Sequence, residues 1–335
     1  MNRLKAMTQA ERLRLAVGLI LLSWSVACFG WYQYQLRPVS ASTHGKLIII
    51  ERGMSVDTIS NRLEQAQLIK SATAFSLYVT IHGLRGRLQS GAYDLHPNQS
   101  SRAIAKMITK GQTASKKLTI PEGFTISAIR ARVATYGIDP SAFDAALQQD
   151  LTGTQAARRP AGTSLEGYLF PDTYTITPAT TATTLVRAMV DHFDTRVTPD
   201  VVAGFAAQGL SLQQGVTLAS VVEREVSGAA DQKLVAGVFL NRLKAGQKLQ
   251  SDVTVDYAAA ILGKSFNLQL NSPYNTYVVP GLPIGPICNP GLATMQAVAH
   301  PTASNYYYFV AGKDGKTHYA ETVDQHNANV QKYLR

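Results

Sequence analysis

The chain has few cysteines and lacks several motifs that would indicate a particular chemistry. Its two cysteines are Cys28, in an apolar run near the N-terminus, and Cys288, near the other end, so we expect no disulfide between them. No base flanks Cys288 to make it a nucleophile, and Ser220 is not in the G-x-S-x-G turn of a serine hydrolase. Zinc-ligand spacing is also missing from the C-terminal histidines, His300, His318 and His326. We therefore expect no metal or other cofactor.

Charged residues are also few, at 16% of the chain, whereas 45% of residues are hydrophobic. This balance is typical of a globular protein and not of a disordered one. The net charge of +10 would suit nucleic acid, but the basic residues are spread along the chain. No Lys/Arg run is interleaved with aromatics, and no zinc-finger or helix-turn-helix signature occurs. An acidic polymer or anionic lipid headgroups would explain the charge equally well.

One long apolar run does occur, from residue 15 to about residue 34, and it ends in three aromatic residues. Its length suits a bilayer, and aromatic residues are common at the membrane interface. The preceding segment is basic: Arg3, Lys5, Arg12 and Arg14 stand against Glu11 alone. We predict a cytoplasmic tail (1–14), a transmembrane helix (15–36) and an extracytoplasmic remainder. A cleaved signal peptide is the alternative, but no small-x-small cleavage site follows the run.

Two folded regions are expected after the anchor, since 335 residues allow two cores. A polar linker (37–45) leads to a module (46–114) with a strand at 46–51, helices beginning at Ser55 and Ser71, and a strand at 90–95. This βααβ order resembles that of LysM modules, which bind N-acetylated glycans. Residues 115–160 are predicted to form a connector, and 161–335 a larger mixed α/β domain. The fold class is therefore α+β.

The larger domain is predicted to be mainly helical, with helices at 184–197, 200–208, 231–245 and 250–262. A loop at 271–291 carries four prolines among its glycines, so it cannot be a helix or a central strand. Such a stiff loop suits a sugar-binding groove, although a well-packed surface connection would look the same. Strands at 306–311 and 318–321 and a helix from Thr322 close the chain.

The segment Ser211–Val226 predicts the central helix of this domain, because Ser211 is a good N-cap and no proline follows. Helical periodicity places Glu223 within an apolar stripe and sends Glu225 to a different face. A carboxyl group in apolar surroundings is costly to ionise, and an acid that keeps its proton suits general-acid catalysis. The alternative is a structural glutamate paired with a base such as Arg242.

Several blocks resemble the signatures of the endolytic murein transglycosylase family (MltG, or YceG-like). They begin with LEGYLFPDTY at Leu165–Tyr174 and LASVVERE at Leu218–Glu225. The others follow in the family's order: residues 239–243, 249–252, 275–277 and 281–291, and His326-Asn327. Together they cover the chain from about residue 115 onward. The anchor and the LysM-like module also fit this family.

The resemblance implies an enzyme of the bacterial cytoplasmic (inner) membrane that cuts peptidoglycan glycan strands internally. Glu223 matches the catalytic residue: it would protonate the bond between N-acetylmuramic acid and N-acetylglucosamine, then take the proton of the C6 hydroxyl as a 1,6-anhydro ring closes. Water is not consumed, so one carboxyl can serve both steps. The predicted substrate-binding residues are Glu166, Tyr174, Asn241, Gln250, Ser251, Asp252, Asn275 and Tyr277.

Two other functions remain open. A muramidase would hydrolyse the same bond if a second carboxylate, such as Glu166 or Asp172, lay within about 5–9 Å of Glu223. A non-catalytic, membrane-anchored scaffold could bind glycan through the module and the basic surface alone. The resemblance also implies that the protein works beside peptidoglycan synthases and limits strand length.

Overall fold

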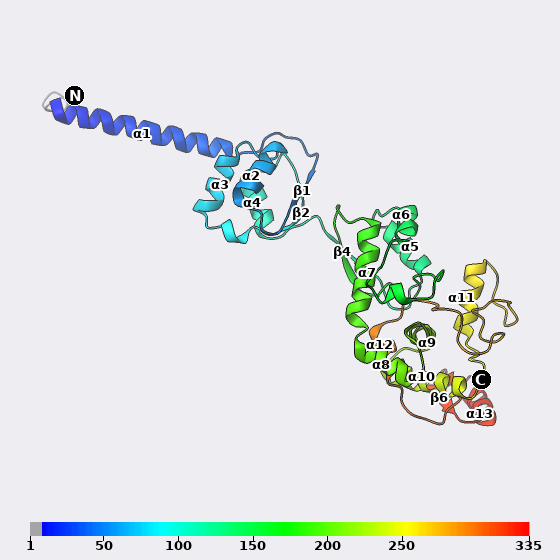
Figure 1. Cartoon of the computed structure of the whole chain (residues 1–335). Helices are drawn as coiled ribbons and strands as arrows, with labels where there is room; N and C mark the ends of the chain where they lie inside the picture. Colours follow the sequence, from blue (N-terminus) through cyan, green and yellow to red (C-terminus); the bar gives the residue numbers. More distant parts are fainter. Residues whose placement is uncertain (1–8, 335) are drawn as a thin grey trace. The chain divides into compact units, whose positions relative to one another are not determined.

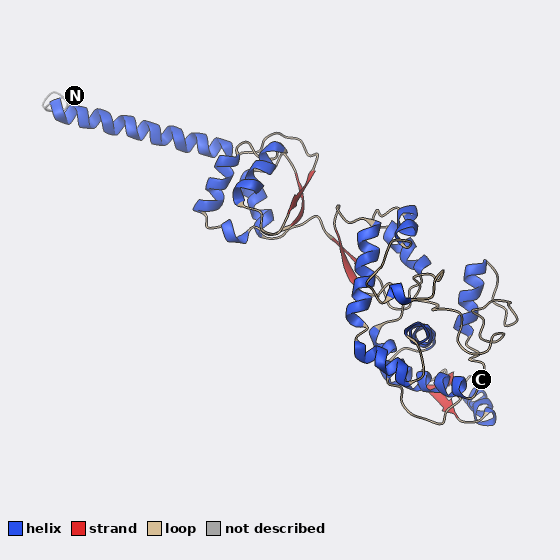
Figure 2. Ribbon diagram, viewed as in Figure 1, coloured by secondary structure: helices blue, strands red, loops and turns tan. Residues whose placement is uncertain are grey.

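The computed structural model describes residues 9–334, with side chains from Leu13 onward, and the chain forms two compact units (Figures 1 and 2). The first contains the chain up to Lys116 with the short segment Ile176–Ala179, and the second contains Lys117–Thr175 and the chain from Thr180. The basic residues Arg3 and Lys5 of the predicted tail lie outside the described residues. Of the predicted connector (115–160), residues 117–160 belong to the second unit, while the domain boundaries stay predictions.

The first unit begins with helix α1 (Gln9–Gln35), whose segment Leu13–Gln35 is long and apolar enough to cross a membrane. From Leu13 to Trp31 its side chains are exposed all round, as expected of a helix that has lipid as its neighbour, whereas Tyr32, Gln33 and Gln35 at its end are half-buried. The hydroxyls of Ser23 and Ser25 donate to carbonyls four residues earlier, so neither presents an unpaired donor. The predicted apolar helix is confirmed.

The module behind the anchor has the predicted βααβ order. Strand β1 (Lys46–Ile50) pairs antiparallel with β2 (Gly91–Leu95), with Ile48 opposite Tyr93. Helices α2 (Val56–Gln65), α3 (Ala72–Ile81) and α4 (Ser101–Thr109) lie in the same unit, with a 3-10 turn at Arg85–Arg87. Ser55, Ser71 and Ser100 cap the three helices through their hydroxyls. One apolar core joins both strands to all three helices.

The second unit opens with a two-stranded pair that the sequence did not predict in full. Strand β3 (Lys116–Thr119) pairs with β4 (Thr173–Ile176), which lies within the LEGYLFPDTY block and its continuation. Between the two strands are α5 (Ile126–Ala134), α6 (Pro140–Ala146) and a 3-10 turn at Ala156–Arg158. Helix α7 (Ala182–Arg196) follows and packs against α6, and α8 (Pro199–Ala207) comes next.

Helix α9 (Leu212–Glu225) runs through the middle of the second unit, and Figure 2 looks along its axis. It contacts α8, α10 (Ala229–Lys244), α11 (Asp252–Leu262) and α12 (Leu292–Ala299). Residues 215–222 are all buried, so α9 has no solvent face along its centre. Its start is fixed by a capping box, in which Ser211 and Gln214 bond each other's backbone. Helix α12 was not predicted.

The chain ends in a small β-hairpin and a helix. Strand β5 (Tyr308–Ala311) pairs antiparallel with β6 (Thr317–Ala320), and α13 (Val323–Tyr333) packs on both strands. The hairpin is joined to α10 by the rings of Phe239 and Phe309, which meet edge to face at 5.7 Å between centroids. The loop 271–291 contains no helix or strand along its fully described length, as predicted.

Candidate active site

The C-terminal end of α9 carries two carboxyl groups on different faces. Glu223 and Glu225 are two positions apart, which separates them by roughly 200° around the helix axis. Both side chains are half-buried. Their surroundings differ: Glu225 borders a cavity, whereas Glu223 is hydrogen-bonded to the segment at the start of α12 (Leu292–Ala299).

Glu225 borders a cavity of about 400 Å³ between α9, α10, the turn before α11 and the C-terminal hairpin and helix. The cavity is lined by Glu225, Phe239, Arg242, Leu249, Gln250, Asp252, Tyr277, Tyr308, Phe309 and His326. The Ser251 hydroxyl donates a hydrogen bond to Glu225 Oε1. Burial raises the pKa of Glu225, and the charge of Asp252 acts in the same direction. The Ser251 hydrogen bond and the guanidinium of Arg242 oppose that rise.

Arg242 is held rigidly in the wall of this cavity. Its Nε donates to the carbonyl of Tyr307 at 2.6 Å, and its Nη1 donates to the carbonyl of Leu249 at 2.8 Å. The guanidinium also lies over the ring of Tyr308, 5.0 Å from its centroid. Burial lowers the pKa of Arg242. Because these contacts hold the guanidinium in place, its charge has a fixed position from which it can stabilise the ionised form of Glu225.

The turn Gln250–Asp252 is pinned to the proline-rich loop. Gln250 has a positive φ of 49°, an uncommon conformation for a residue with a side chain. The backbone N–H groups of Gln250 and Ser251 donate to the carbonyl and the hydroxyl of Thr276, at 3.2 and 3.0 Å. Tyr277 donates its hydroxyl to Asp252 Oδ1 at 2.6 Å. Four of the predicted substrate-binding residues thus meet around Glu225.

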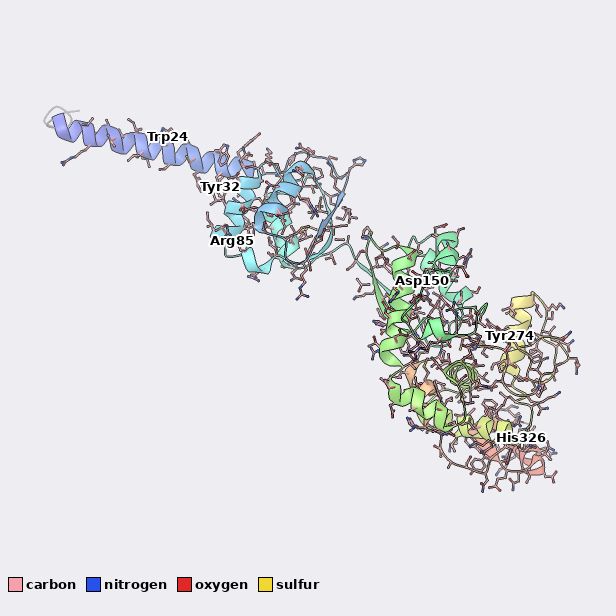
Figure 3. All side chains as sticks on the ribbon, viewed as in Figure 1. Trp24, Tyr32, Arg85, Asp150, Tyr274 and His326 are labelled. Carbon is pink, nitrogen blue, oxygen red and sulfur yellow. The ribbon has the colours of Figure 1, made fainter. Side chains whose placement is uncertain are left out.

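His326, from the C-terminal helix, completes the cavity wall (Figure 3). Its ring stacks on that of Tyr308, with centroids 5.4 Å apart and planes inclined by 28°. Burial and the charge of Arg242 lower the pKa of His326, which favours the neutral ring. Within residues 9–334, its Nδ1 is buried without a hydrogen-bond partner. In the sequence this histidine belongs to the last family block, His326-Asn327, but no role in the site was predicted for it.

Glu223 is bonded to the start of α12. Its Oε2 accepts hydrogen bonds from the backbone N–H of Gly291 at 3.0 Å and the hydroxyl of Thr294 at 2.5 Å. Gly291 is the N-cap of α12 and offers no side-chain acceptor, so Glu223 supplies the negative group that a helix N-terminus favours. These surroundings are polar, whereas the sequence predicted apolar ones. Glu223 is not among the residues that line the Glu225 cavity.

A second carboxyl, which no pattern in the sequence predicted, lies beside Glu223. An added Cβ on Gly291 would fall 1.8 Å from Glu122 Oε1, so the Glu122 carboxyl lies against this glycine. Burial raises the pKa of Glu122, and the neighbouring Glu223 raises it further. A motif search would not have found Glu122, since about 100 positions separate it from Glu223 in the sequence.

Glu166 joins three segments through its hydrogen bonds. Its side chain is buried, at 3% exposure, and accepts hydrogen bonds from Ile126 N–H at 3.0 Å, Asn289 Nδ2 at 3.0 Å and the Tyr257 hydroxyl at 3.2 Å. Burial raises its pKa to about 7, against the opposing effect of these hydrogen bonds. We expected it among the substrate-binding residues. Its donors come from α5, the loop before α12 and α11, so it stabilises the unit.

Three other predicted site residues are also bonded to the protein's own backbone. Tyr174 is buried and donates its hydroxyl to the carbonyl of Phe170. Asn275 is fully buried and donates to the carbonyls of Leu268 and Leu270. Asn241 donates to two carbonyls of the segment before β5, at 2.8 and 3.0 Å, outside the Glu225 cavity. The structure does not bring these three to Glu225.

Asp172, weighed above as a second catalytic carboxylate, pairs with bases of α7. Its Oδ2 lies 3.1 Å from His192 Nδ1 and 3.6 Å from Arg196 Nη2. Across residues 9–334, no group of three or more His, Cys, Asp or Glu side chains is arranged to hold a metal ion.

Together these features define a class of protein: an N-terminal apolar helix, a βααβ module, and a second unit with the carboxyl groups of Glu225 and Asp252 on a polar cavity. Comparison with known proteins gives the family. The YceG-like family model matches residues 48–332, and the chain belongs to this family.

Named relatives agree with this assignment. An endolytic murein transglycosylase of Bacillus subtilis (strain 168) is 33% identical, over 89% of this chain and 88% of that protein. One of Streptococcus pneumoniae (strain D39) is 32% identical over 91% of this chain, which spans 62% of the pneumococcal protein. A crystal structure of a putative YceG-like protein from Listeria monocytogenes, 32% identical, matches 86% of this chain and 99% of that chain with a TM-score of 0.57.

Proposed function

We propose that this protein is an endolytic peptidoglycan lytic transglycosylase, with Glu225 as its acid and base. The observation that carries the proposal is the position of Glu225: a half-buried carboxyl facing a polar cavity, touched by Ser251 and near Arg242. Relatives that bear the name endolytic murein transglycosylase support the substrate, the glycan strand of peptidoglycan. The raised pKa of Glu225 suits an acid that holds its proton until the bond breaks.

The reaction requires the same carboxyl to work twice. Protonated Glu225 gives its proton to the glycosidic oxygen between N-acetylmuramic acid and N-acetylglucosamine as that bond breaks. The resulting carboxylate is stabilised by the Ser251 hydroxyl and by the charge of Arg242. It then takes the proton of the muramoyl C6 hydroxyl while this oxygen closes onto C1. The product carries a 1,6-anhydro ring, and Glu225 has regained its proton.

Glu223 is the alternative acid that the sequence favoured, and paired variants separate the two. We expect Glu225→Gln to lose about 10²- to 10⁴-fold of the activity, the usual contribution of general acid–base catalysis. The variant Glu223→Gln keeps the shape of the residue, and it should retain activity if the only role of Glu223 is to cap α12. Digestion of isolated glycan strands, followed by mass spectrometry of the fragments, measures both. Loss of activity in Glu223→Gln with full activity in Glu225→Gln would reverse our assignment.

The same digest tests a muramidase. Asp252 lines the cavity beside Glu225 and could assist a water molecule, as the second carboxylate of a hydrolase does. Fragments with 1,6-anhydro ends support the transglycosylase, and fragments with reducing ends support hydrolysis. Intact strands that still bind the protein would instead indicate an anchored scaffold without catalysis.

The other parts of the chain fit this activity. We propose that α1 crosses the bacterial cytoplasmic membrane with the basic N-terminus inside, so that both units face the peptidoglycan. The βααβ module would act as a LysM-like glycan-binding module, as its order of elements and its excess of basic residues suggest. Cutting strands near the membrane would limit their length, and peptidoglycan synthases, which make them, are the partners we expect. Cysteine accessibility at the two ends of α1 in intact cells tests the orientation.

A further inference from the structure

Helix α3 has an exposed apolar face beside the end of the membrane anchor. Leu77 and Ile81, four positions apart and therefore on one face, are 43% and 64% exposed. Together with Tyr78 and His82 they line a cavity of about 660 Å³, whose other walls come from Phe29, Tyr32 and Gln33 of α1 and from Arg102 of α4. We call Leu77 and Ile81, with this cavity, the α3 face. Figure 3 labels Tyr32 in α1 and Arg85 just after α3.

The α3 face is held at a fixed level relative to α1. Leu36, directly after the anchor, is only 2% exposed, and its carbonyl accepts a hydrogen bond from Ser101 N–H at 3.1 Å. The ammonium of Lys70 lies 3.8 Å from the centroid of the Tyr34 ring. The anchor is therefore docked on the module and is not joined to it by a flexible linker. The predicted linker begins only after this docked segment.

The level of the α3 face corresponds to the membrane interface. Phe29 borders the cavity and lies six positions before Gln35, the end of the span, or about 9 Å along the helix axis. Tyr32, one turn nearer the end, lies among Trp31 and Tyr34, aromatic residues of the type that marks the headgroup region. If α1 crosses a bilayer, Leu77 and Ile81 reach the boundary between acyl chains and headgroups.

Charge around the α3 face suits the same surface. Residues 70–110 contain six Lys or Arg and one carboxylate, Asp94, and Asp57 of α2 adds a second carboxylate where it accepts a hydrogen bond from Ser76 of α3. Arg85 lies on one side of α3, where it borders a cavity shared with Leu77, and Lys106 lies on the other side with Tyr78 and His82. Both side chains are exposed. Apolar residues flanked by cations are the pattern of a segment that lies on an anionic membrane.

We propose that the α3 face lies against the outer surface of the bilayer, with Leu77 and Ile81 among the acyl chains and the flanking cations on anionic phospholipid headgroups. The module would then be held flat on the membrane instead of projecting from it. This second contact would restrict the height above the bilayer at which glycan reaches the chain. The proposal requires α1 to span the membrane, but it does not depend on the identity of the catalytic acid.

Lipid-borne quenchers test this placement in the full-length protein. A bimane label is attached at Ile81→Cys in a Cys28→Ser background, and the protein is reconstituted in vesicles whose acyl chains carry bromine. A matched control places the label at Gln65→Cys, an exposed residue of α2 outside the α3 face. We expect the label at position 81 to lose most of its fluorescence and the label at position 65 to lose little.

The anchor supplies an internal reference, because both tryptophans of the chain, Trp24 and Trp31, lie in α1. If the tryptophans are quenched while the label at position 81 stays accessible to aqueous iodide, the proposal is wrong and the face is free for a protein partner. If the tryptophans are not quenched either, α1 does not lie in the bilayer, and the proposal is wrong for that reason. Glycan digestion by the same sample tests the catalytic proposal separately.

The headgroup contribution has its own readout. Adding phosphatidylglycerol to phosphatidylcholine vesicles should increase the quenching at position 81, and the double variant Arg85→Gln/Lys106→Gln should lose this increase. Quenching that is equal with and without phosphatidylglycerol would overturn the proposed binding of anionic headgroups.

Discussion

Replacing Glu166 by glutamine should make the second unit more stable at neutral and alkaline pH. Glu166 is buried and accepts hydrogen bonds from Ile126, Asn289 and Tyr257. A glutamine has nearly the same shape, its oxygen can accept from the two N–H donors, and its amide can donate to the Tyr257 hydroxyl. The substitution therefore keeps the packing and removes only the group that can ionise.

The size of the effect follows from the raised pKa of this carboxyl. Its ordinary value is 4.5 and burial raises it to about 7. At about 1.4 kcal/mol per pH unit, ionising Glu166 in the folded protein costs about 3 kcal/mol more than in the unfolded chain. The folded state therefore binds a proton that the unfolded state has lost, so stability falls as the pH rises between these two values. The stability is unaffected below pH 4.5, the ordinary pKa, and stays reduced above about pH 7, the pKa in the folded protein.

Urea unfolding of the full-length protein in detergent, read by pulse proteolysis of the second unit, measures this profile. Between about pH 5 and about pH 8 the free energy of unfolding of the wild type should fall relative to that of Glu166→Gln by up to about 3 kcal/mol. Asp256→Asn, an exposed position on the helix that carries Tyr257, controls for the loss of one negative charge. Parallel pH profiles for the wild type and Glu166→Gln would refute the reasoning.

Three further outcomes are expected. Gly215→Ala should destabilise the protein by about 1–3 kcal/mol in thermal unfolding, because the new Cβ would come within 2.4 Å of the Phe205 ring. Thr294→Val should lower the free energy of unfolding in urea by about 1–3 kcal/mol, because it removes the hydroxyl that donates a hydrogen bond to the carboxyl group of Glu223. Glycan cleavage should decline as the pH rises through the raised pKa of Glu225, and Ser251→Ala should move this decline to higher pH, since the Ser251 hydrogen bond lowers that pKa.

The sequence predicted helices well where their start signals are local. Ser55, Ser71 and Ser211 each provide the hydroxyl that caps the helix after them. Helix α12 was missed because its start signal is not local. Its N-cap is Gly291, and the acceptor at its N-terminus comes from Glu223, 68 positions earlier. A helix capped by a tertiary contact offers no pattern in its own sequence.

The residues that line the Glu225 cavity could be predicted only in part, for a similar reason. Gln250, Ser251, Asp252 and Tyr277 belong to motif blocks, and they meet around one cavity. The opposite wall, with Tyr308 and His326, comes from the C-terminal hairpin and helix. The residues of one wall do not predict those of the other from the sequence, because only the packing of the hairpin on α10 brings the two walls together.

The choice between Glu223 and Glu225 shows most clearly what periodicity can and cannot decide. An apolar stripe identifies the buried face of a helix only when the other faces meet solvent. Helix α9 is enclosed by α8, α10, α11 and α12, so its residues 215–222 are buried on every face, and near its end Arg224 is exposed while Glu223 and Glu225 are both half-buried. Whether a face of the helix borders a cavity depends on the segment that packs against it. Glu223 meets the start of α12, to which it is hydrogen-bonded. Glu225 meets the turn at Gln250, which Thr276 holds in a strained conformation. The cavity, and with it the acid that we propose, is thus set by the loop that packs on α9 and not by the helix itself.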